Sequence, residues 1–278
     1  MTDSDTAIDW SYSNSQLYAS CPRSLFFHYW QRSGTAEASN SGGDAIVLGS
    51  TESGGAIIGN AIHKALEEHI RRWAQNERTG MQQTQSVAHS YIREALSQRP
   101  ESQSLDGPTL SETTDTHLKR FFKTVWPTIR SQRYILHEKT DSFTLDGTKV
   151  WVRPDLCVRE FDNDNKFIIY DWKSRQPSTF EDTSLQLRVY ALWAHKKYEP
   201  DIERISTRLF FTGNGHIKRQ SVSIQDLEHL ETRIMSEAAE WNPPNRKSSF
   251  PTKADPKKCK KCPYLSSCAD GKRELRSL

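Results

Sequence analysis

The stretch KFIIYDWK, residues 166–173, decides the fold expected for this chain. Its apolar run is typical of a buried strand ending at residue 172, and Asp171 and Lys173 stand two residues apart, so both side chains point to the same face. The preceding expected strand, residues 149–160, contains the run Arg153-Pro154-Asp155. We therefore predict that Asp155, Asp171 and Lys173 converge at the ends of two neighbouring strands.

Alternating and apolar runs predict the other strands, and apolar residues at steps of four predict helices. The expected strands cover residues 134–145, 149–160, 166–172, 205–211 and 216–222, the first three forming a meander with turns at 146–147 and 162–165. Expected helices cover residues 15–30, 56–77, 83–98, 111–132, 184–198 and 225–241, and a long loop covers residues 33–55. Strands flanked by helices predict an α/β fold with a mixed central β-sheet covered on both faces.

We expect these elements to form a single domain over residues 1–278. Within it we expect a mainly helical part over residues 1–132, an α/β core over residues 133–241 and a basic cysteine-rich segment over residues 242–278. That last segment carries a net charge of +7, so the remainder of this +3 chain carries −4. A basic end could neutralise phosphates, or it could be a solvated tail without a partner.

The composition is that of a soluble globular protein, with 35% hydrophobic and 26% charged residues. No apolar run approaches the roughly 18 residues that span a bilayer, so no membrane partner is expected. The polar start has no export signal, and a cytoplasmic location is therefore expected. In that reducing compartment clustered thiols are expected to bind metal rather than form disulfides.

The acids and the lysine have the chemistry of metal-dependent phosphodiester hydrolysis, which needs charge neutralisation and a hydroxide near neutral pH. Asp155 and Asp171 are candidate oxygen ligands for Mg²⁺ or Mn²⁺, together with the backbone carbonyl of Trp172. Lys173 can orient the attacking water or help to deprotonate it. His63 could add an imidazole ligand, which favours manganese over magnesium.

Four cysteines form a second candidate site, with Cys21 near one end of the chain and Cys259, Cys262 and Cys268 near the other. Cys21 is expected on the first helix. A site with four thiolates can hold zinc or a 4Fe-4S cluster, and thiol chemistry alone leaves both open. Either would fasten the last segment to the first. Cys157, close to Asp155, is expected to be a buried small hydrophobe.

The order of these motifs resembles that of the RecB-type nucleases of the PD-(D/E)XK superfamily. The matching runs are GNAIH at 59–63, PD at 154–155, DWK at 171–173 and QLRVY at 186–190. The resemblance implies a restriction-endonuclease-like core, with metal ligands at His63, Asp155 and Asp171, a catalytic lysine at Lys173 and positioning roles for Gln186 and Tyr190. Glu138, on the first expected strand, is a further candidate for lining the site.

The division of the cysteines into one and three resembles the iron-staple subgroup, which includes the AddB-like and CRISPR-associated exonuclease-like branches. This resemblance favours a 4Fe-4S cluster over zinc. It also implies a metal-dependent deoxyribonuclease, an exonuclease that prefers single-stranded DNA or DNA ends, although endonuclease activity is compatible with the motifs. The implied settings are DNA repair, defence or CRISPR adaptation.

Two rival functions come from other classes. One is a non-catalytic nucleic-acid-binding subunit of a repair or defence complex, and the other is an iron-sulfur redox protein. The intact acids and lysine argue against the first, and the distance in sequence between cysteines and acids argues against the second. The chain has no helicase P-loop, so unwinding would need a helicase or another protein partner.

Overall fold

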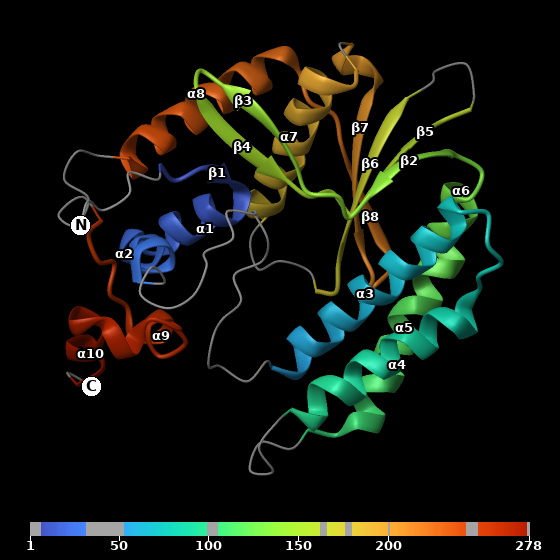
Figure 1. Cartoon of the computed structure of the whole chain (residues 1–278), viewed down its shortest axis with the longest axis horizontal. Coiled ribbons are helices and arrows are strands. Elements are labelled where there is room, and N and C mark those ends of the chain that lie inside the picture. Colours follow the sequence, from blue (N-terminus) through green and yellow to red (C-terminus); the bar gives the residue numbers. More distant parts are fainter. Residues whose placement is uncertain are drawn as a thin grey trace, which may run out of the picture. The chain divides into compact units, whose positions relative to one another are not determined.

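The computed structural model describes residues 7–31, 53–98, 105–161, 166–175, 180–199, 201–242 and 250–276. The chain divides into two compact units that alternate along the sequence (Figure 1). Unit 1 comprises Met1–Ser50, Thr140–Val152 and Gln225–Leu278, and unit 2 comprises Thr51–Lys139 and Arg153–Ile224. That the units form a single domain stays a prediction.

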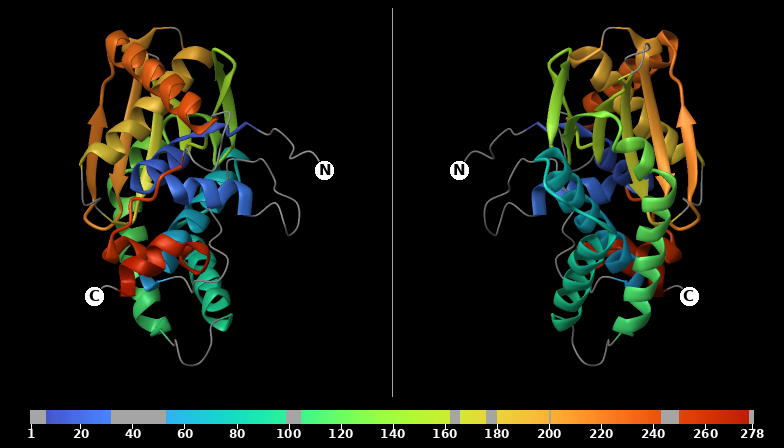
Figure 2. Two further views of the ribbon diagram at one scale, coloured as in Figure 1. Left: turned by 90° about the vertical axis from the view of Figure 1, so that its left-hand side faces the viewer. Right: turned by 90° about the vertical axis from the view of Figure 1, so that its right-hand side faces the viewer.

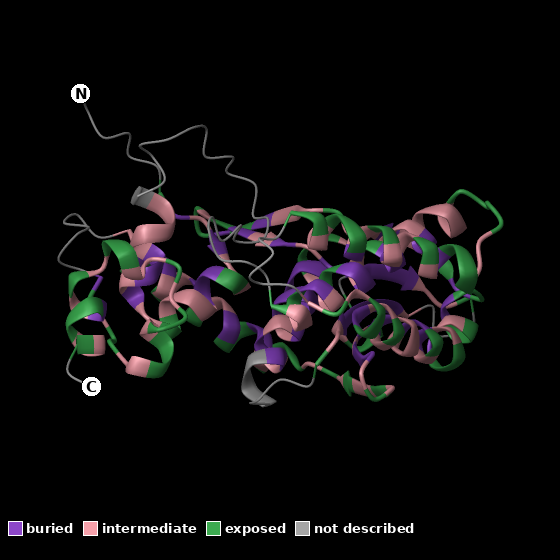
Figure 3. Ribbon diagram, turned by 90° about the horizontal axis from the view of Figure 1, so that it is seen from below, coloured by how far each residue is buried: buried purple, intermediate pink, exposed green. Residues whose placement is uncertain are grey.

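Unit 2 contains a five-stranded sheet with the order β2-β5-β6-β7-β8. The strands are β2 (Arg133–His137), β5 (Leu156–Arg159), β6 (Phe167–Lys173), β7 (Ile205–Phe211) and β8 (His216–Gln220). β6 and β7 are parallel, whereas the other neighbours are antiparallel. The sheet is therefore mixed, as predicted. All residues of β6 but the last are buried, as expected for a central strand. Figure 3 colours the ribbon by burial, with buried residues in purple and exposed residues in green.

Helices cover both faces of this sheet. On one face, α3 (Gly54–Ala74), α4 (Met81–Ser97) and α5 (Gly107–Thr124) lie side by side, and α6 (Trp126–Ile129) follows (Figure 2). The apolar stripe of α3 packs in one core with even-numbered residues of the central strands, including Ile168, Tyr170 and Trp172. The odd-numbered Asp171 and Lys173 consequently face α7 (Phe180–Lys197), which contacts β6 and β7.

Unit 1 contains a three-stranded sheet, β1-β4-β3, and several helices. Its elements are β1 (Trp10–Ser11), α1 (Tyr12–Ser20), α2 (Pro22–Phe26), the π-helix η1 (Phe27–Gln31), β3 (Asp141–Leu145), β4 (Thr148–Val152), α8 (Ile224–Trp241), α9 (Pro256–Cys259), the 3₁₀ helix η5 (Leu265–Ser267) and α10 (Ala269–Arg276). Trp10 and Trp241 stack with their ring centroids 6.3 Å apart. Both side chains are fully buried, so this pair joins the first strand to α8.

The expected three-stranded meander is wrong, because two of its strands break. The expected strand 149–160 divides into β4 and β5, which belong to different sheets, and the expected strand 134–145 divides in the same way into β2 and β3. Pro154 at the first break has no amide N–H for a ladder. Glu138 at the second has a positive φ of 44°, which no strand tolerates.

The expected helix through Cys21 is also interrupted. Cys21 has an extended conformation, with φ −161° and ψ 109°, and lies between α1 and α2. Pro22 explains the break, since its ring disfavours the helical conformation of the preceding residue. Most of the expected loop 33–55 and the expected turn at 162–165 lie outside the described residues. Within the described ranges, no helix combines the length and apolarity that crossing a bilayer requires.

Candidate active site

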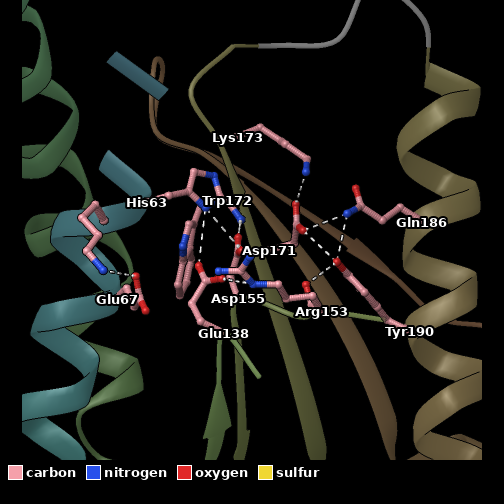
Figure 4. A network of polar contacts seen from close by, with 11 residues as sticks. His63, Glu67, Glu138, Arg153, Asp155, Asp171, Trp172, Lys173, Gln186 and Tyr190 are labelled. Carbon is pink, nitrogen blue, oxygen red and sulfur yellow. Dashed lines mark hydrogen bonds and ion pairs between the residues drawn. The ribbon is translucent and has the colours of Figure 1, made fainter. Parts of the chain in front are cut away.

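Three side chains from three elements meet at one edge of the five-stranded sheet (Figure 4). His63 comes from α3, Glu138 follows β2 and Asp155 precedes β5. Each offers one potential ligand atom, and these three atoms lie within 4.8 Å of one another. His63 Nδ1 is 3.4 Å from Asp155 Oδ1 and 3.6 Å from Glu138 Oε1. A nitrogen and two carboxylates at this spacing can hold a divalent cation.

Glu138 reaches this group through its left-handed backbone. The conformation is held by its own N–H, which donates to the carbonyls of Pro154 and Asp155 at 3.1 and 3.3 Å. Its carboxylate also forms an ion pair with Arg153, with Oε2 3.0 Å from Nε. Strained non-glycine residues of this kind cluster at functional sites. The sequence pattern predicts Glu138 only as a further candidate for lining the site, and nothing in it signals the ion pair with Arg153.

Asp155 and Asp171 are connected through the backbone between them. The Trp172 N–H donates to Asp155 Oδ2 at 2.6 Å, and Asp171 Oδ2 forms an ion pair with Lys173 Nζ at 2.8 Å (Figure 4). Asp171 and Lys173 therefore point to the same face of the sheet, as predicted. Asp171 is not part of the 4.8 Å group, because its oxygens face Lys173 and α7 instead.

Gln186 and Tyr190 lie one turn apart on α7 and hold the second oxygen of Asp171. Gln186 Nε2 donates to Asp171 Oδ1 at 3.1 Å and to the Tyr190 hydroxyl at 2.9 Å. The Tyr190 hydroxyl lies 2.9 Å from the carbonyl of Arg153 and 3.3 Å from Asp171 Oδ1. The two residues thus brace the strand end that carries Asp171 and the loop that carries Asp155 (Figure 4).

The charges at the site shift several pKa values. Burial, with a further contribution from the charge of Asp171, raises the pKa of the Asp155 carboxyl to about 7 despite the nearby His63. Burial alone would lower the pKa of His63, but the charge of Asp155 and hydrogen bonds to Asp155 and Glu138 hold it well above its usual value. Burial and the charges of Asp171 and Asp155 raise the pKa of Tyr190 well above its usual value. A buried carboxyl that retains a proton near neutral pH marks a place where a cation is favoured.

The four cysteines lie in unit 1 and line one cavity of about 270 Å³, together with the basic side chains of Arg23, Lys253, Lys258 and Lys261. Backbone N–H groups point at three of the sulfurs. The N–H of Lys253 lies 3.4 Å from Cys21 Sγ, that of Asp255 lies 3.5 Å from Cys259 Sγ, and that of Gly271 lies 3.4 Å from Cys268 Sγ. Among the described residues, no three thiol sulfurs lie within 4.8 Å of one another. Cys157 is separate and fully buried, as expected.

Comparison with known proteins identifies the family. Residues 9–269 match the sequence profile of the PD-(D/E)XK nuclease superfamily. No curated protein matches the chain. A solved structure titled "Crystal structure of SSO0001" is 14% identical, with 76% of this chain and 84% of that chain covered and a TM-score of 0.33, a likeness that adds nothing to the assignment. On the profile match, which covers most of its length, the chain belongs to the PD-(D/E)XK nuclease superfamily.

Proposed function

We propose that this protein is a magnesium- or manganese-dependent deoxyribonuclease whose active site comprises His63, Asp155, Asp171 and Lys173. One observation carries the proposal: the ligand atoms of His63, Glu138 and Asp155 meet within 4.8 Å beside the strand end that bears the Asp171–Lys173 ion pair. Two carboxylates and an imidazole grouped next to an ammonium suit metal-dependent phosphodiester hydrolysis.

The donor set fits a divalent cation. Carboxylate oxygens suit Mg²⁺ and Mn²⁺ alike, and the imidazole of His63 favours manganese. A cation held there supplies positive charge for the transition state and lowers the pKa of a bound water. We assign Asp171 and the backbone carbonyl of Trp172 as further ligands. We add Glu138 because its carboxylate lies beside His63 and Asp155.

The remaining residues act on the reactants or on the ligands. Lys173 holds its ammonium 2.8 Å from Asp171 Oδ2. Its role from there is to orient the attacking water and to stabilise charge on a phosphate oxygen. Gln186 and Tyr190 fix Asp171 through its other oxygen. Arg153 neutralises part of the charge of Glu138.

The test is cleavage of end-labelled single- and double-stranded DNA and of RNA with Mn²⁺, Mg²⁺ or EDTA. We expect metal-dependent cleavage of DNA by the wild type and none by Asp171→Asn. Glu199→Gln is the matched control, because Glu199 is another buried acid and pairs with Arg159 at the other end of β5. Manganese-dependent cleavage retained by Asp171→Asn would refute the assigned site. DNA binding without cleavage under all conditions would favour a non-catalytic binding subunit.

The preference for single strands or free ends is proposed on the resemblance to the iron-staple subgroup, and the basic carboxyl-terminal segment supports binding to nucleic acid. Its lysines and arginines at positions 253, 257, 258, 260, 261, 272, 273 and 276 are all exposed. An exposed basic surface can follow a phosphate backbone without reading sequence. Linear and circular single-stranded DNA of one sequence distinguish the modes, since an exonuclease degrades only the linear form. The proposed setting is repair, defence or CRISPR adaptation, with a helicase or adaptation protein as partner.

We also propose that the four cysteines bind a 4Fe-4S cluster. Four thiols lining one cavity supply its ligands, and N–H groups aimed at three sulfurs stabilise thiolates, as do the surrounding basic side chains. Four thiolates can also hold zinc. The division of the cysteines into one and three, which resembles that of the iron-staple subgroup, favours the cluster.

Anaerobic purification tests the cluster directly. We expect a broad absorption near 400 nm, about four irons per chain and no stoichiometric zinc. Cys262→Ala should lose the iron and lower the unfolding midpoint, whereas Cys157→Ala should keep the iron. A colourless protein that binds one zinc would replace the cluster by a structural zinc site. Full stability and activity in Cys262→Ala would contradict a structural role.

A further inference from the structure

Thr212 is a fully buried threonine that directly follows β7 beside the end of β6. Its backbone N–H donates to the Lys173 carbonyl at 2.9 Å, and its hydroxyl donates to the same carbonyl at 3.3 Å. In the parallel register of these strands Lys173 lies opposite Phe211, so Thr212 is the first residue beyond the ladder. The carbonyl that ends β6 is therefore held twice by one residue.

Two residues of α5 hold Thr212 and its neighbour in turn. His117 Nδ1 lies 2.8 Å from Thr212 Oγ1, and Arg120 donates a hydrogen bond to the carbonyl of Gly213. Burial and the charge of Arg120 lower the pKa of His117, so the ring is neutral near pH 7. With the proton on Nδ1, the ring donates to the Thr212 hydroxyl and the hydroxyl donates to the Lys173 carbonyl, which satisfies all three groups.

Ser174, the residue after Lys173, packs closely against two glycines. A Cβ on Gly213 would lie 2.7 Å from the backbone oxygen of Ser174, too close for any side chain. A Cβ on Gly59 of α3, one turn before His63, would lie 3.1 Å from the Ser174 hydroxyl. The backbone on both sides of Lys173 is thus held by close packing and by hydrogen bonds.

We propose that Thr212, His117 and Arg120 are positioning residues that hold the end of β6 and so keep the Lys173 ammonium on Asp171. The proposal rests on the nuclease function proposed above. Lys173 is the last residue of β6, and beyond it the ladder no longer restrains the backbone. Its ammonium stands on a flexible four-carbon stem, so its position depends on the backbone at its root. A small displacement of a catalytic group lowers the rate strongly.

The decisive variant is Thr212→Val, which removes the hydroxyl and retains the shape and the backbone N–H. We expect kcat for DNA cleavage to fall by about tenfold or more with KM unchanged, and Thr212→Ser to restore it. The matched control is Thr207→Val. Thr207 is also fully buried on β7, and its hydroxyl donates to the Gln220 carbonyl at 3.0 Å. It should destabilise the sheet to a similar degree and leave kcat unchanged.

A second measurement needs no activity. The rate at which an amine-reactive reagent labels Lys173, followed by peptide mass spectrometry, reports how firmly its ammonium is held. We expect labelling to rise severalfold in Thr212→Val and to stay at the wild-type rate in Thr207→Val. His117→Phe combined with Thr212→Val should be no worse than Thr212→Val alone, because both act through one chain of hydrogen bonds.

The outcomes separate the two proposals. A wild type that cleaves nothing refutes the nuclease function, while the labelling rates still decide whether these residues position Lys173. If Thr212→Val behaves like Thr207→Val in labelling, the positioning role is overturned whatever the activity. A fall in kcat without a change in labelling overturns it as well, since Lys173 would then not be the group that moved.

Discussion

Replacing Asp155 by Asn should stabilise the metal-free protein, and the gain should increase with pH. The Asp155 carboxyl is buried, and its pKa rises from 3.8 to about 7 on folding. Folded protein therefore keeps a proton that unfolded protein loses between these two values. Stability falls as the pH rises from about 4 to about 7 and does not fall further above that. Asn carries no charge, so it avoids this loss, and its amide oxygen can still accept the Trp172 N–H.

A pKa that rises from 3.8 to about 7 corresponds to a loss of about 4 kcal/mol in unfolding free energy above pH 7, since a tenfold change in the equilibrium is worth about 1.4 kcal/mol. His63 acts in the opposite direction. Its pKa is raised, so its protonated form stabilises the fold until the pH passes that raised value, and part of this stabilisation depends on the charge of Asp155. The value of about 4 kcal/mol is therefore a ceiling, and we expect a gain of about 2 to 4 kcal/mol at pH 8.

Urea unfolding in EDTA at pH 5 and pH 8 measures this gain. The advantage of Asp155→Asn over the wild type should grow by about 2 to 3 kcal/mol between the two pH values. Glu199→Gln provides a control of opposite sign. Burial alone would raise the pKa of Glu199, but the hydrogen bond to Arg159 lowers it below its usual value, so this substitution should destabilise the protein. A gain for Asp155→Asn that is absent at pH 8, or equal at both pH values, would refute the reasoning.

Three further outcomes are expected. Tyr190→Phe should lower the free energy of unfolding by about 1 to 3 kcal/mol, because Gln186 loses the buried hydroxyl as a hydrogen-bond partner. The value of kcat should fall as well, and an unchanged kcat in a stable variant would remove Tyr190 from the site. Phe250→Ala should lower the unfolding free energy by about 3 to 5 kcal/mol, because this fully buried ring packs on Tyr18 and Phe26; a urea midpoint like that of the wild type would contradict that packing. Gly213→Ala should lower kcat and thermal stability together, whereas Gly80→Ala, where a Cβ meets nothing within 4 Å, should lower neither.

The sequence was most informative where one period dominated. Alternation along β6 was enough to put Asp171 and Lys173 on one face, and the stripe of Ile62, Leu66 and Ile70 was enough to place α3 against a core. The α/β class and the mixed sheet followed from the order of such segments. In each case many side chains favour the same arrangement, so local patterns and tertiary packing agree.

The sequence was less informative where a single residue changed the path of the backbone. The alternation of apolar residues continues through Pro154. The pattern therefore predicts one unbroken strand there, although proline lacks the N–H that a strand ladder needs. The left-handed turn at Glu138 had no glycine or asparagine to signal it. Thr212 stands 39 residues after Lys173, so only the parallel pairing of β6 with β7 could reveal their contact.

The interleaving of the units has a consequence for biosynthesis. All segments of unit 2 have been synthesised once residue 224 is complete, before α8 and the carboxyl-terminal segment of unit 1 are added. Trp10, by contrast, must wait for Val150 as its strand partner and for Trp241 as its stacking partner. Until then the first helices of the chain expose apolar side chains to chaperones and proteases. Trp10 and the helices that follow it are thus synthesised well before the residues that complete their native contacts.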